Sequence, residues 1–274
     1  MWLILFIGLI SLYFIKSILF DRLPREYKNF EKIYVKHNID NNRDGYSKKK
    51  IPKDLDVIVI GSGIGGLTVA GLLSKIGKKV LVLEQHYIAG GCTHAFEDKG
   101  FEFDTGIHYV GNIKKRKKIL DLITENPIKW DKMGREDNKF VYDEIKIGDK
   151  EYNFRAGEQN FIDDLVEKFP DEKENIIKYV NLVKEVSQKD LFFLLKIAKP
   201  RCLARLLNPW VSKRFFEMTK KTAHEVIKDI TQNEELIAVL CGQFGDSGPP
   251  PSEGSFFMHA SVANHYLEGG WYPH

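Results

Sequence analysis

The feature that most constrains this chain is a glycine-rich turn between a predicted strand and a predicted helix. The apolar run Asp56–Ile60 leads into Gly-Ser-Gly-Ile-Gly-Gly at residues 61–66, and a second apolar run, Lys79–Leu83, ends on the acid Glu84. Strand, glycine triplet, helix, strand and acid in this order predict a dinucleotide-binding βαβ unit of an α/β fold. The helix is indicated by apolar residues at helical spacing, namely Leu67, Ala70, Leu72, Leu73 and Ile76.

Each residue of this turn has a physical reason for its place. Gly61 permits the tight turn, Gly63 lets the backbone approach a pyrophosphate, and Gly66 lets the helix pack close to the strand. The helix N-terminus offers free N–H groups to the phosphates. Ser62 is a candidate donor to the same phosphates, and Glu84 stands where an acid accepts a ribose hydroxyl. The alternative interpretation is a glycine-rich turn that holds no ligand.

A second glycine pair follows the acid. Gln85 comes directly after Glu84, and Gly90-Gly91 lies five residues further on. Such a pair resembles the second fingerprint of flavin-binding oxidoreductases, because two glycines tolerate positive φ and bring backbone N–H groups near a phosphate or ring edge. We therefore predict that Gln85, Gly90 and Gly91 join the cofactor site. An ordinary tight turn is the alternative.

Four motifs narrow the interpretation further. They are Leu-Glu-Gln-His at 83–86 with Gly-Gly-Cys-Thr-His at 90–94; Glu-Phe-Asp-Thr-Gly-Ile-His-Tyr at 102–109; Cys-Gly-Gln-Phe-Gly-Asp at 241–246 with Pro-Pro-Ser-Glu at 250–253; and Asn-His-Tyr-Leu-Glu-Gly-Gly-Trp-Tyr-Pro at 264–273. Together they resemble the retinol saturase family, the all-trans-retinol reductases related to carotenoid isomerases and phytoene desaturases. The resemblance runs from about residue 53 to the last residue.

The resemblance implies an α/β fold, with a Rossmann-like FAD-binding domain of a GR2-type flavoprotein and an incomplete α+β substrate or cap domain. It also implies saturation of one carbon–carbon double bond of a retinoid-like polyene, with FAD as cofactor, at the endoplasmic reticulum membrane. The one dinucleotide fingerprint is assigned to flavin. NAD(P)H as electron donor would therefore bind elsewhere or act through a partner reductase.

The candidate catalytic residue is His108, which the resemblance places near the flavin ring. His94 and His86 are also candidates for acid–base work, because imidazole titrates near neutral pH. Two other functions stay open. One is a carotenoid isomerase or desaturase, and the other is a truncated, non-catalytic paralogue that binds a membrane or a full-length partner. Because the family's members are longer, we expect a truncated product or an incomplete gene model.

The domain organisation follows from composition and pattern. Residues 1–20 are mostly apolar, with Lys16 as their one charged side chain, and predict a membrane anchor or signal. An uncleaved anchor is favoured because neither a basic start nor a small-x-small cleavage site is clear, and the basic residues that follow favour a cytoplasmic main body. Residues 21–54 are a polar tether, and residues 55–127 are the first part of the Rossmann-like domain. Residues 128–274 are a partial substrate or cap domain, with short antiparallel strands, a hairpin turn at Gly148-Asp149 and then helices.

Several classes of partner are excluded or suggested by the remaining sequence. A formal net charge of +3 is too small to indicate nucleic acid. The three cysteines, Cys92, Cys202 and Cys241, form neither a disulfide framework nor a zinc motif, and no metal site is expected. Segment 191–216 mixes apolar and basic residues and suits a helix lying on a membrane surface, with a core helix pair as the alternative. The basic run 114–118 is either an anionic-membrane or phosphate contact or a solvated helix face.

Overall fold

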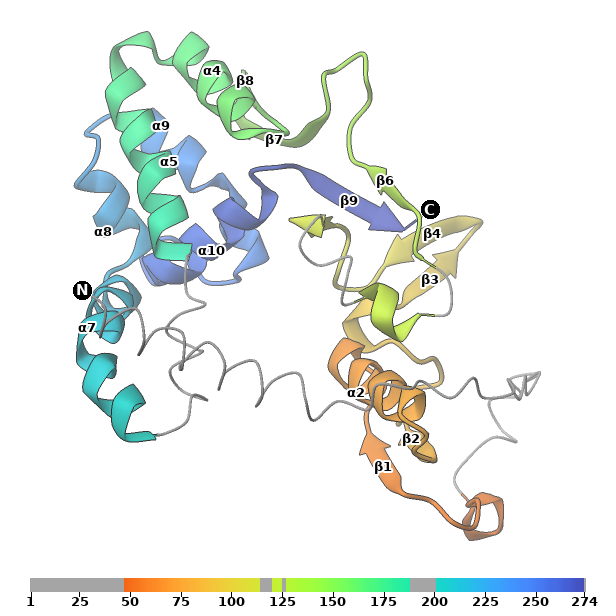
Figure 1. The fold of residues 1–274 in the computed structure, drawn as a ribbon. Coiled ribbons are helices and arrows are strands. Elements are labelled where there is room, and N and C mark those ends of the chain that lie inside the picture. The colour runs from red at the N-terminus through yellow and green to blue at the C-terminus, as the bar shows by residue number, and fades with distance from the viewer. Residues whose placement is uncertain (1–46, 114–119, 125–126, 188–200, 274) are drawn as a thin grey trace. The chain divides into compact units, whose positions relative to one another are not determined.

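The computed structural model of this 274-residue chain describes residues 47–113, 120–124, 127–187 and 201–273 (Figure 1). The chain forms two compact units. The first is Met1–Ile107 with Lys118–Pro127, and the second is His108–Lys117 with Ile128–His274. The anchor predicted for residues 1–20 and most of the tether lie outside the described residues, as do the basic run 114–118 and the segment 188–200.

The first unit is built on a parallel strand pair. After a short 3-10 helix η1 (Lys48–Lys50), β1 (Val57–Ile60) pairs with β2 (Val80–Leu83), and α2 (Ile64–Lys75) connects them. The register places Ile58 opposite Leu81. The predicted βαβ unit is confirmed, with each strand within one residue of its predicted start.

A hairpin that the sequence analysis did not predict follows in the first unit. After the 3-10 turn η2 (Gly91–Thr93), β3 (Ala95–Asp98) and β4 (Phe101–Asp104) pair in antiparallel fashion. The two turn residues Lys99 and Gly100 both have positive φ, +53° and +82°. Two successive residues with positive φ are the requirement of a type I′ turn, whose twist matches that of the flanking strands.

The second unit contains two small antiparallel sheets. In one, β9 (Gly270–Pro273) lies between β5 (Val110–Gly111) and β6 (Trp130–Lys132). In the other, β7 (Val141–Ile147) and β8 (Lys150–Arg155) form a hairpin around the predicted turn at Gly148. The predicted short antiparallel strands are confirmed here, and β7 has an irregularity in its register between Val141 and Asp143.

Helices pack together beside the β7–β8 hairpin and hold most of the hydrophobic core of the second unit (Figure 1). The helices predicted to follow the hairpin turn are confirmed. Phe154, Ile176, Leu236 and Phe256, from β8, α5, α9 and α10, are each at most 1% exposed. The helical elements are α4 (Glu158–Lys168), η3 (Pro170–Glu172), α5 (Lys173–Ser187), α7 (Arg201–Lys220), α8 (Ala223–Lys228), α9 (Glu234–Leu240), η4 (Gly242–Asp246) and α10 (Phe256–Tyr266).

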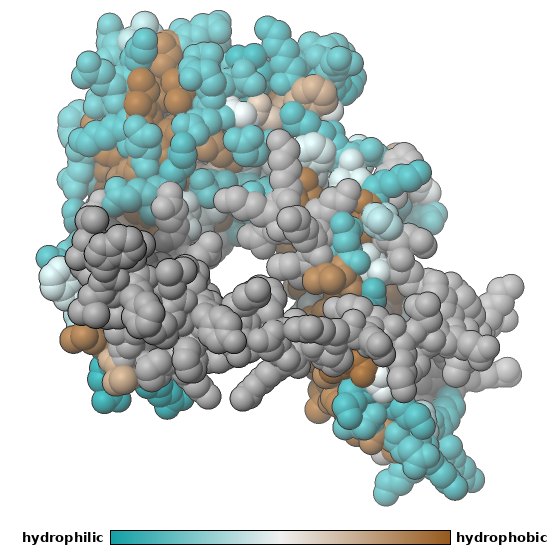
Figure 2. Space-filling view, in the orientation of Figure 1, coloured by the Kyte–Doolittle hydropathy of each residue, from teal (hydrophilic) through white to brown (hydrophobic). Residues whose placement is uncertain are grey.

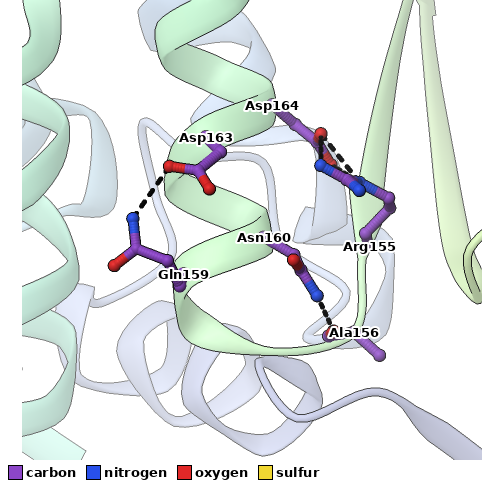
Figure 3. Close-up of polar contacts among 6 residues, drawn as sticks. All are labelled: Arg155, Ala156, Gln159, Asn160, Asp163 and Asp164. Atoms are coloured by element: carbon purple, nitrogen blue, oxygen red, sulfur yellow. Dashed lines mark hydrogen bonds and ion pairs between the residues drawn. The ribbon is translucent and has the colours of Figure 1, made fainter.

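Polar contacts also join elements of this unit, and two of them illustrate how. Arg155 Nε, at the end of β8, donates to both carboxylate oxygens of Asp164 on α4 at 2.8 and 2.7 Å, with a further bond from its terminal nitrogen (Figure 3). This fork orients α4 on the hairpin. Inside the core, the Tyr179 hydroxyl on α5 lies 2.8 Å from His259 Nε2 on α10. Burial lowers the pKa of His259 to about 4, so that its ring is neutral at pH 7.

In the part of the chain that the structure describes, no helix has the combination of length and apolar composition that crossing a membrane requires.

Candidate cofactor site

The two predicted glycine segments lie against each other in the first unit. Gly63 and Gly90 form a parallel bridge, and Gly90 N donates to Ser62 O at 3.1 Å. The φ angles of Gly90 and Gly91 are +122° and +57°. A Cβ on Gly91 would stand 3.0 Å from Gly63 Cα. The second segment therefore needs glycine both for its backbone conformation and for its approach to the first.

The glycines of the first segment have two different roles. A Cβ on Gly66 would lie 2.1 Å from Gly61 O, so that Gly66 allows α2 to begin close to β1. Gly61 has a φ of +94° and donates its N–H to Leu83 O of β2 at 2.7 Å. At Gly63, the N-cap of α2, a Cβ would meet no atom within 4 Å. Gly63 thus keeps the space at the helix N-terminus open, where backbone N–H groups favour an anion.

Glu84 lies directly beside these glycines. Its carboxylate accepts hydrogen bonds from the Ser62 hydroxyl, from His86 N at 2.8 Å and from Ser62 N at 2.7 Å. These bonds lower the pKa of Glu84 to about 2, so that it is ionised at neutral pH. Gln85 is exposed next to it. An ionised, oriented carboxylate with lone pairs still available suits the ribose hydroxyl that the sequence assigned to it.

Ser62 links the acid to the second glycine segment. Its side chain is only 1% exposed, and its hydroxyl donates to Glu84 while accepting from Gly90 N at 3.2 Å. The structure therefore describes Ser62 as the group that orients Glu84. Its predicted hydrogen bond to a phosphate stays a prediction.

His94 holds the second glycine segment from the other side. Its Nδ1 lies 2.6 Å from Gly91 O, and its Nε2 lies 3.0 Å from Thr105 Oγ1 at the end of the β3–β4 hairpin. His94 was predicted only as a candidate for acid–base work, so that this positioning role is an addition to the prediction. His86 is exposed, with its ring centroid 5.0 Å from that of His94. Acid–base roles for both rings stay predictions.

His108 belongs to the other unit, of which it is the first residue. It is exposed, and its charge acts on Asp246 of that unit. Its predicted catalytic role stays a prediction.

The cysteines show no metal or disulfide chemistry. Cys92, Cys202 and Cys241 are all free thiols. Within residues 47–113, 120–124, 127–187 and 201–273, no group of three or more His, Cys, Asp or Glu side chains is arranged to hold a metal ion.

Comparison with known proteins agrees with this geometry. A profile of NAD(P)-binding Rossmann-like domains matches residues 59–125, the segment that contains both glycine loops. Putrescine oxidase bound to putrescine has a similar structure, with a TM-score of 0.51 and 15% identity over 80% of this chain and 46% of that chain. At this identity the likeness shows the fold alone, a Rossmann-like α/β domain joined to a second domain, and it confirms the predicted fold class.

Sequence relatives are more specific. The chain is 41% identical to all-trans-retinol 13,14-reductase of Danio rerio over 84% of this chain and 39% of that protein. It is 35% identical to an inactive all-trans-retinol 13,14-reductase of the same species, and 37% identical to a chloroplastic prolycopene isomerase of Daucus carota over only 46% of the chain. The chain spans about two fifths of the length of the reductases that it matches, and over that length its predicted resemblance to the retinol saturase family is confirmed.

Proposed function

We propose that this chain supplies the FAD-binding part of an oxidoreductase that saturates one carbon–carbon double bond of a retinoid-like polyene. The observation that carries the proposal is 41% identity to an all-trans-retinol 13,14-reductase over 84% of this chain. The meeting of the two glycine segments beside an ionised Glu84 supports it independently.

The residues present fit a dinucleotide such as FAD. The open space at Gly63 and the N-terminus of α2 suit the pyrophosphate, and the carboxylate of Glu84 suits a ribose hydroxyl. Gly61 and Gly66 shape the turn, while Gln85, Gly90 and Gly91 border the same place. When bound, the flavin would supply hydride chemistry. We propose NAD(P)H as the source of electrons, either bound elsewhere or acting through a partner reductase.

Two other functions are each favoured by one observation. The partial match to a prolycopene isomerase favours isomerisation of a carotenoid-like polyene without net reduction. The 35% match to an inactive reductase favours a non-catalytic paralogue. The two differ from the leading proposal in measurable ways, because an isomerase leaves the number of conjugated double bonds unchanged and a non-catalytic paralogue needs no flavin.

The deciding experiment measures flavin and product on the same protein. The chain is purified in detergent, its visible absorption spectrum is recorded, and flavin released by denaturation is counted per chain. All-trans-retinol is then added anaerobically to the reduced protein. The proposal expects close to one flavin per chain and a product that absorbs at shorter wavelength, because saturation shortens the conjugated system. A product of unchanged conjugation would indicate the isomerase, and colourless protein would indicate the non-catalytic paralogue.

We further propose that the enzyme works at the endoplasmic reticulum membrane, because a polyene substrate dissolves in lipid. Imaging of the tagged chain against a marker of that membrane tests the location, and a cytosolic signal would reject it.

A further inference from the structure

Lysine side chains gather at the end of the first unit that is opposite the glycine segments. Two parts of the chain supply them: residues 47–53, which contain η1, and the turn that leads from α2 into β2. All six lysines are exposed, and they are called here the lysine pole: Lys48, Lys49, Lys50, Lys53, Lys78 and Lys79. Figure 2 shows hydrophilic residues over η1 and the loop that follows it. None of the six belongs to the predicted cofactor site.

Asp56 joins the two parts at the start of the strand pair. Its backbone N–H donates to Lys79 O at 3.0 Å, and its carboxylate accepts a hydrogen bond from Lys79 N at 2.9 Å. Lys78 Nζ lies 3.3 Å from the same carboxylate. Lys53 comes three residues before Asp56, and three residues span at most about 11 Å. Both groups of lysines therefore meet where β1 and β2 begin.

The 3-10 helix η1 spreads its lysines over a compact turn. Ser47 caps it, with Lys49 N donating to Ser47 Oγ at 3.4 Å and Lys50 N donating to Ser47 O at 3.0 Å. Successive side chains of a 3-10 helix point about 120° apart. Ile51, which is 38% exposed, follows directly. Cations that spread apart, with an exposed aliphatic side chain beside them, suit a wide anionic surface better than one bound anion.

The lysine pole carries a marked share of the positive charge of the chain. Residues 47–56 and 78–79 contain six lysines and two aspartates, Asp54 and Asp56, an excess of four positive charges. The whole chain has a formal net charge of +3, so that the rest of it is close to neutral. The hydrogen bond from Lys79 N, together with Lys78, lowers the pKa of Asp56, which is therefore ionised at neutral pH.

The pole and the cofactor site lie at opposite ends of one βαβ unit. Gly63 caps the start of α2, whereas Lys78 and Lys79 follow its end, and this 12-residue helix is roughly 18 Å long. The β3–β4 hairpin begins beside the second glycine segment, where His94 N donates to Gly91 O at 3.3 Å. It carries four acids: Glu97, Asp98, Glu102 and Asp104. An anionic surface would attract the pole, repel the hairpin and leave the space at Gly63 open.

We propose that the lysine pole is a docking surface for the anionic headgroups of a bilayer leaflet. Lysine ammonium groups are compact, strongly hydrated point charges, which suit diffuse attraction to a surface, whereas the fork of arginine suits bidentate recognition of one phosphate. Polybasic segments beside a membrane anchor are attracted to anionic lipids in this way. The pole closely follows residues 1–20, for which the sequence predicts an anchor. This inference goes beyond the proposed reaction and does not depend on it.

The first test measures the reactivity of each lysine in the full chain. The chain is reconstituted into vesicles of phosphatidylcholine alone, or of phosphatidylcholine and phosphatidylserine in equal parts, and is acetylated briefly before mass spectrometry. Lys99 is the internal control, because it is an exposed lysine in the β3–β4 turn of the same unit. Phosphatidylserine should slow acetylation of the lysine pole on the order of fivefold and leave Lys99 unchanged. High salt should remove this protection. Equal rates in the two kinds of vesicle would overturn the proposal.

The second test separates the surface from net charge with two matched variants. One removes three charges from the pole: Lys48→Gln, Lys49→Gln and Lys53→Gln. The other removes three from exposed positions elsewhere: Lys99→Gln, Lys129→Gln and Lys139→Gln. Protection of Lys78 and Lys79 by phosphatidylserine should be lost in the first variant and kept in the second.

Loss of protection in both variants would mean that net charge alone acts, and would overturn the docking surface. Protection by RNA in solution, with none by phosphatidylserine vesicles, would assign the pole to nucleic acid instead. Circular dichroism of each variant establishes that it folds as the wild type does. Neither test needs flavin or a polyene, so that failure of the proposed reaction would leave these results unaffected.

Discussion

At the scale of single residues, Gly63 and Gly66 stand three positions apart and serve different purposes. A methyl group on Gly66 would collide with the carbonyl oxygen of Gly61, whereas a methyl group on Gly63 would enter open space. The φ of Gly63 is −63°, which alanine adopts without strain. Gly66 is therefore required by the protein itself, and Gly63 only by a ligand.

This difference predicts opposite outcomes for two alanine substitutions. Gly66→Ala should lower the free energy of unfolding by about 1–3 kcal/mol, as overpacking does. Gly63→Ala should leave that free energy within about 1 kcal/mol of wild type, because nothing in the protein meets the added methyl group. It should nevertheless weaken flavin binding at least tenfold.

Urea denaturation and flavin titration of the two purified variants check the prediction. Gly65→Ala is a matched control, since a Cβ there also meets no atom within 4 Å and the residue belongs to neither pair of contacts. Equal loss of stability at positions 63 and 66 would contradict the assignment of Gly63 to a ligand.

At the scale of elements, the sequence pattern predicted the elements whose formation depends on residues close together in the chain. β1, α2, β2 and the β7–β8 turn follow from apolar runs and glycine positions over a few residues. The β3–β4 hairpin was missed although Phe101-Glu102-Phe103-Asp104 alternates between apolar and acidic residues, because each of its strands is only four residues long and so gives a weak pattern. The pairing of β9 with β5 was missed because it joins Val110 to Trp271 across most of the chain.

In the candidate site, too, the features set by nearby residues were predicted and the contacts made only after folding were not. Glycine spacing and the acid after β2 predicted which segments meet, because these residues are required by the backbone geometry of the turn. The roles of Ser62 and His94 were not predictable. Each depends on which atoms a side chain reaches after folding: Glu84 and Gly90 for Ser62, and Gly91 and Thr105 for His94.

Helix α7 carries the described part of the predicted membrane-binding segment. Some of its apolar side chains are exposed to solvent, and others pack against the core. Trp210 is 86% exposed and Leu206 is 70% exposed, with the exposed cations of Arg205 and Lys213 on the same helix. Phe215 instead packs against Phe257 of the core, with ring centroids 4.7 Å apart. Exposed aromatic and aliphatic side chains beside cations suit the surface of an anionic bilayer, which we propose as the partner of this helix.

The test removes apolar area without touching the core. Trp210→Ser should reduce co-sedimentation of the chain lacking residues 1–28 with vesicles that contain phosphatidylserine, and high salt should reduce it further. Phe101→Ser is the matched control, because Phe101 is 69% exposed but lies on β4. Equal binding of the Trp210 variant and the wild type would reject α7 as the lipid-facing element.

At the scale of the whole molecule, the two units differ in how much apolar surface they bury. All residues of the hydrophobic core cluster, from Tyr142 to Leu267, belong to the second unit. In the described part of the first unit, Ala70 is the one buried apolar residue. Ile60, by contrast, is 86% exposed, and Figure 2 shows apolar residues at the surface over β1, α2 and β2. Since burial of apolar surface is the main driving force of folding, we expect the first unit to be less stable than the second.

This difference in buried apolar surface predicts that the first unit opens at a lower free energy than the second. It also predicts that bound cofactor raises the free energy of opening of the first unit. Backbone amides of β1 and β2 should exchange with deuterium at lower free energy of opening than those of α5, whose Ile176 is fully buried. Because a ligand that binds only the folded unit stabilises it by RT ln(1 + [L]/Kd), FAD at one hundred times its Kd should protect β1 and β2 by about 2.7 kcal/mol. Protection of α5 should change far less, since its core is complete without the nucleotide.

Hydrogen exchange followed by mass spectrometry, with and without FAD, measures both units in one sample. Equal protection of the two units without FAD would contradict the inference from burial. Protection by FAD confined to α5 would instead move the cofactor site away from the glycine segments.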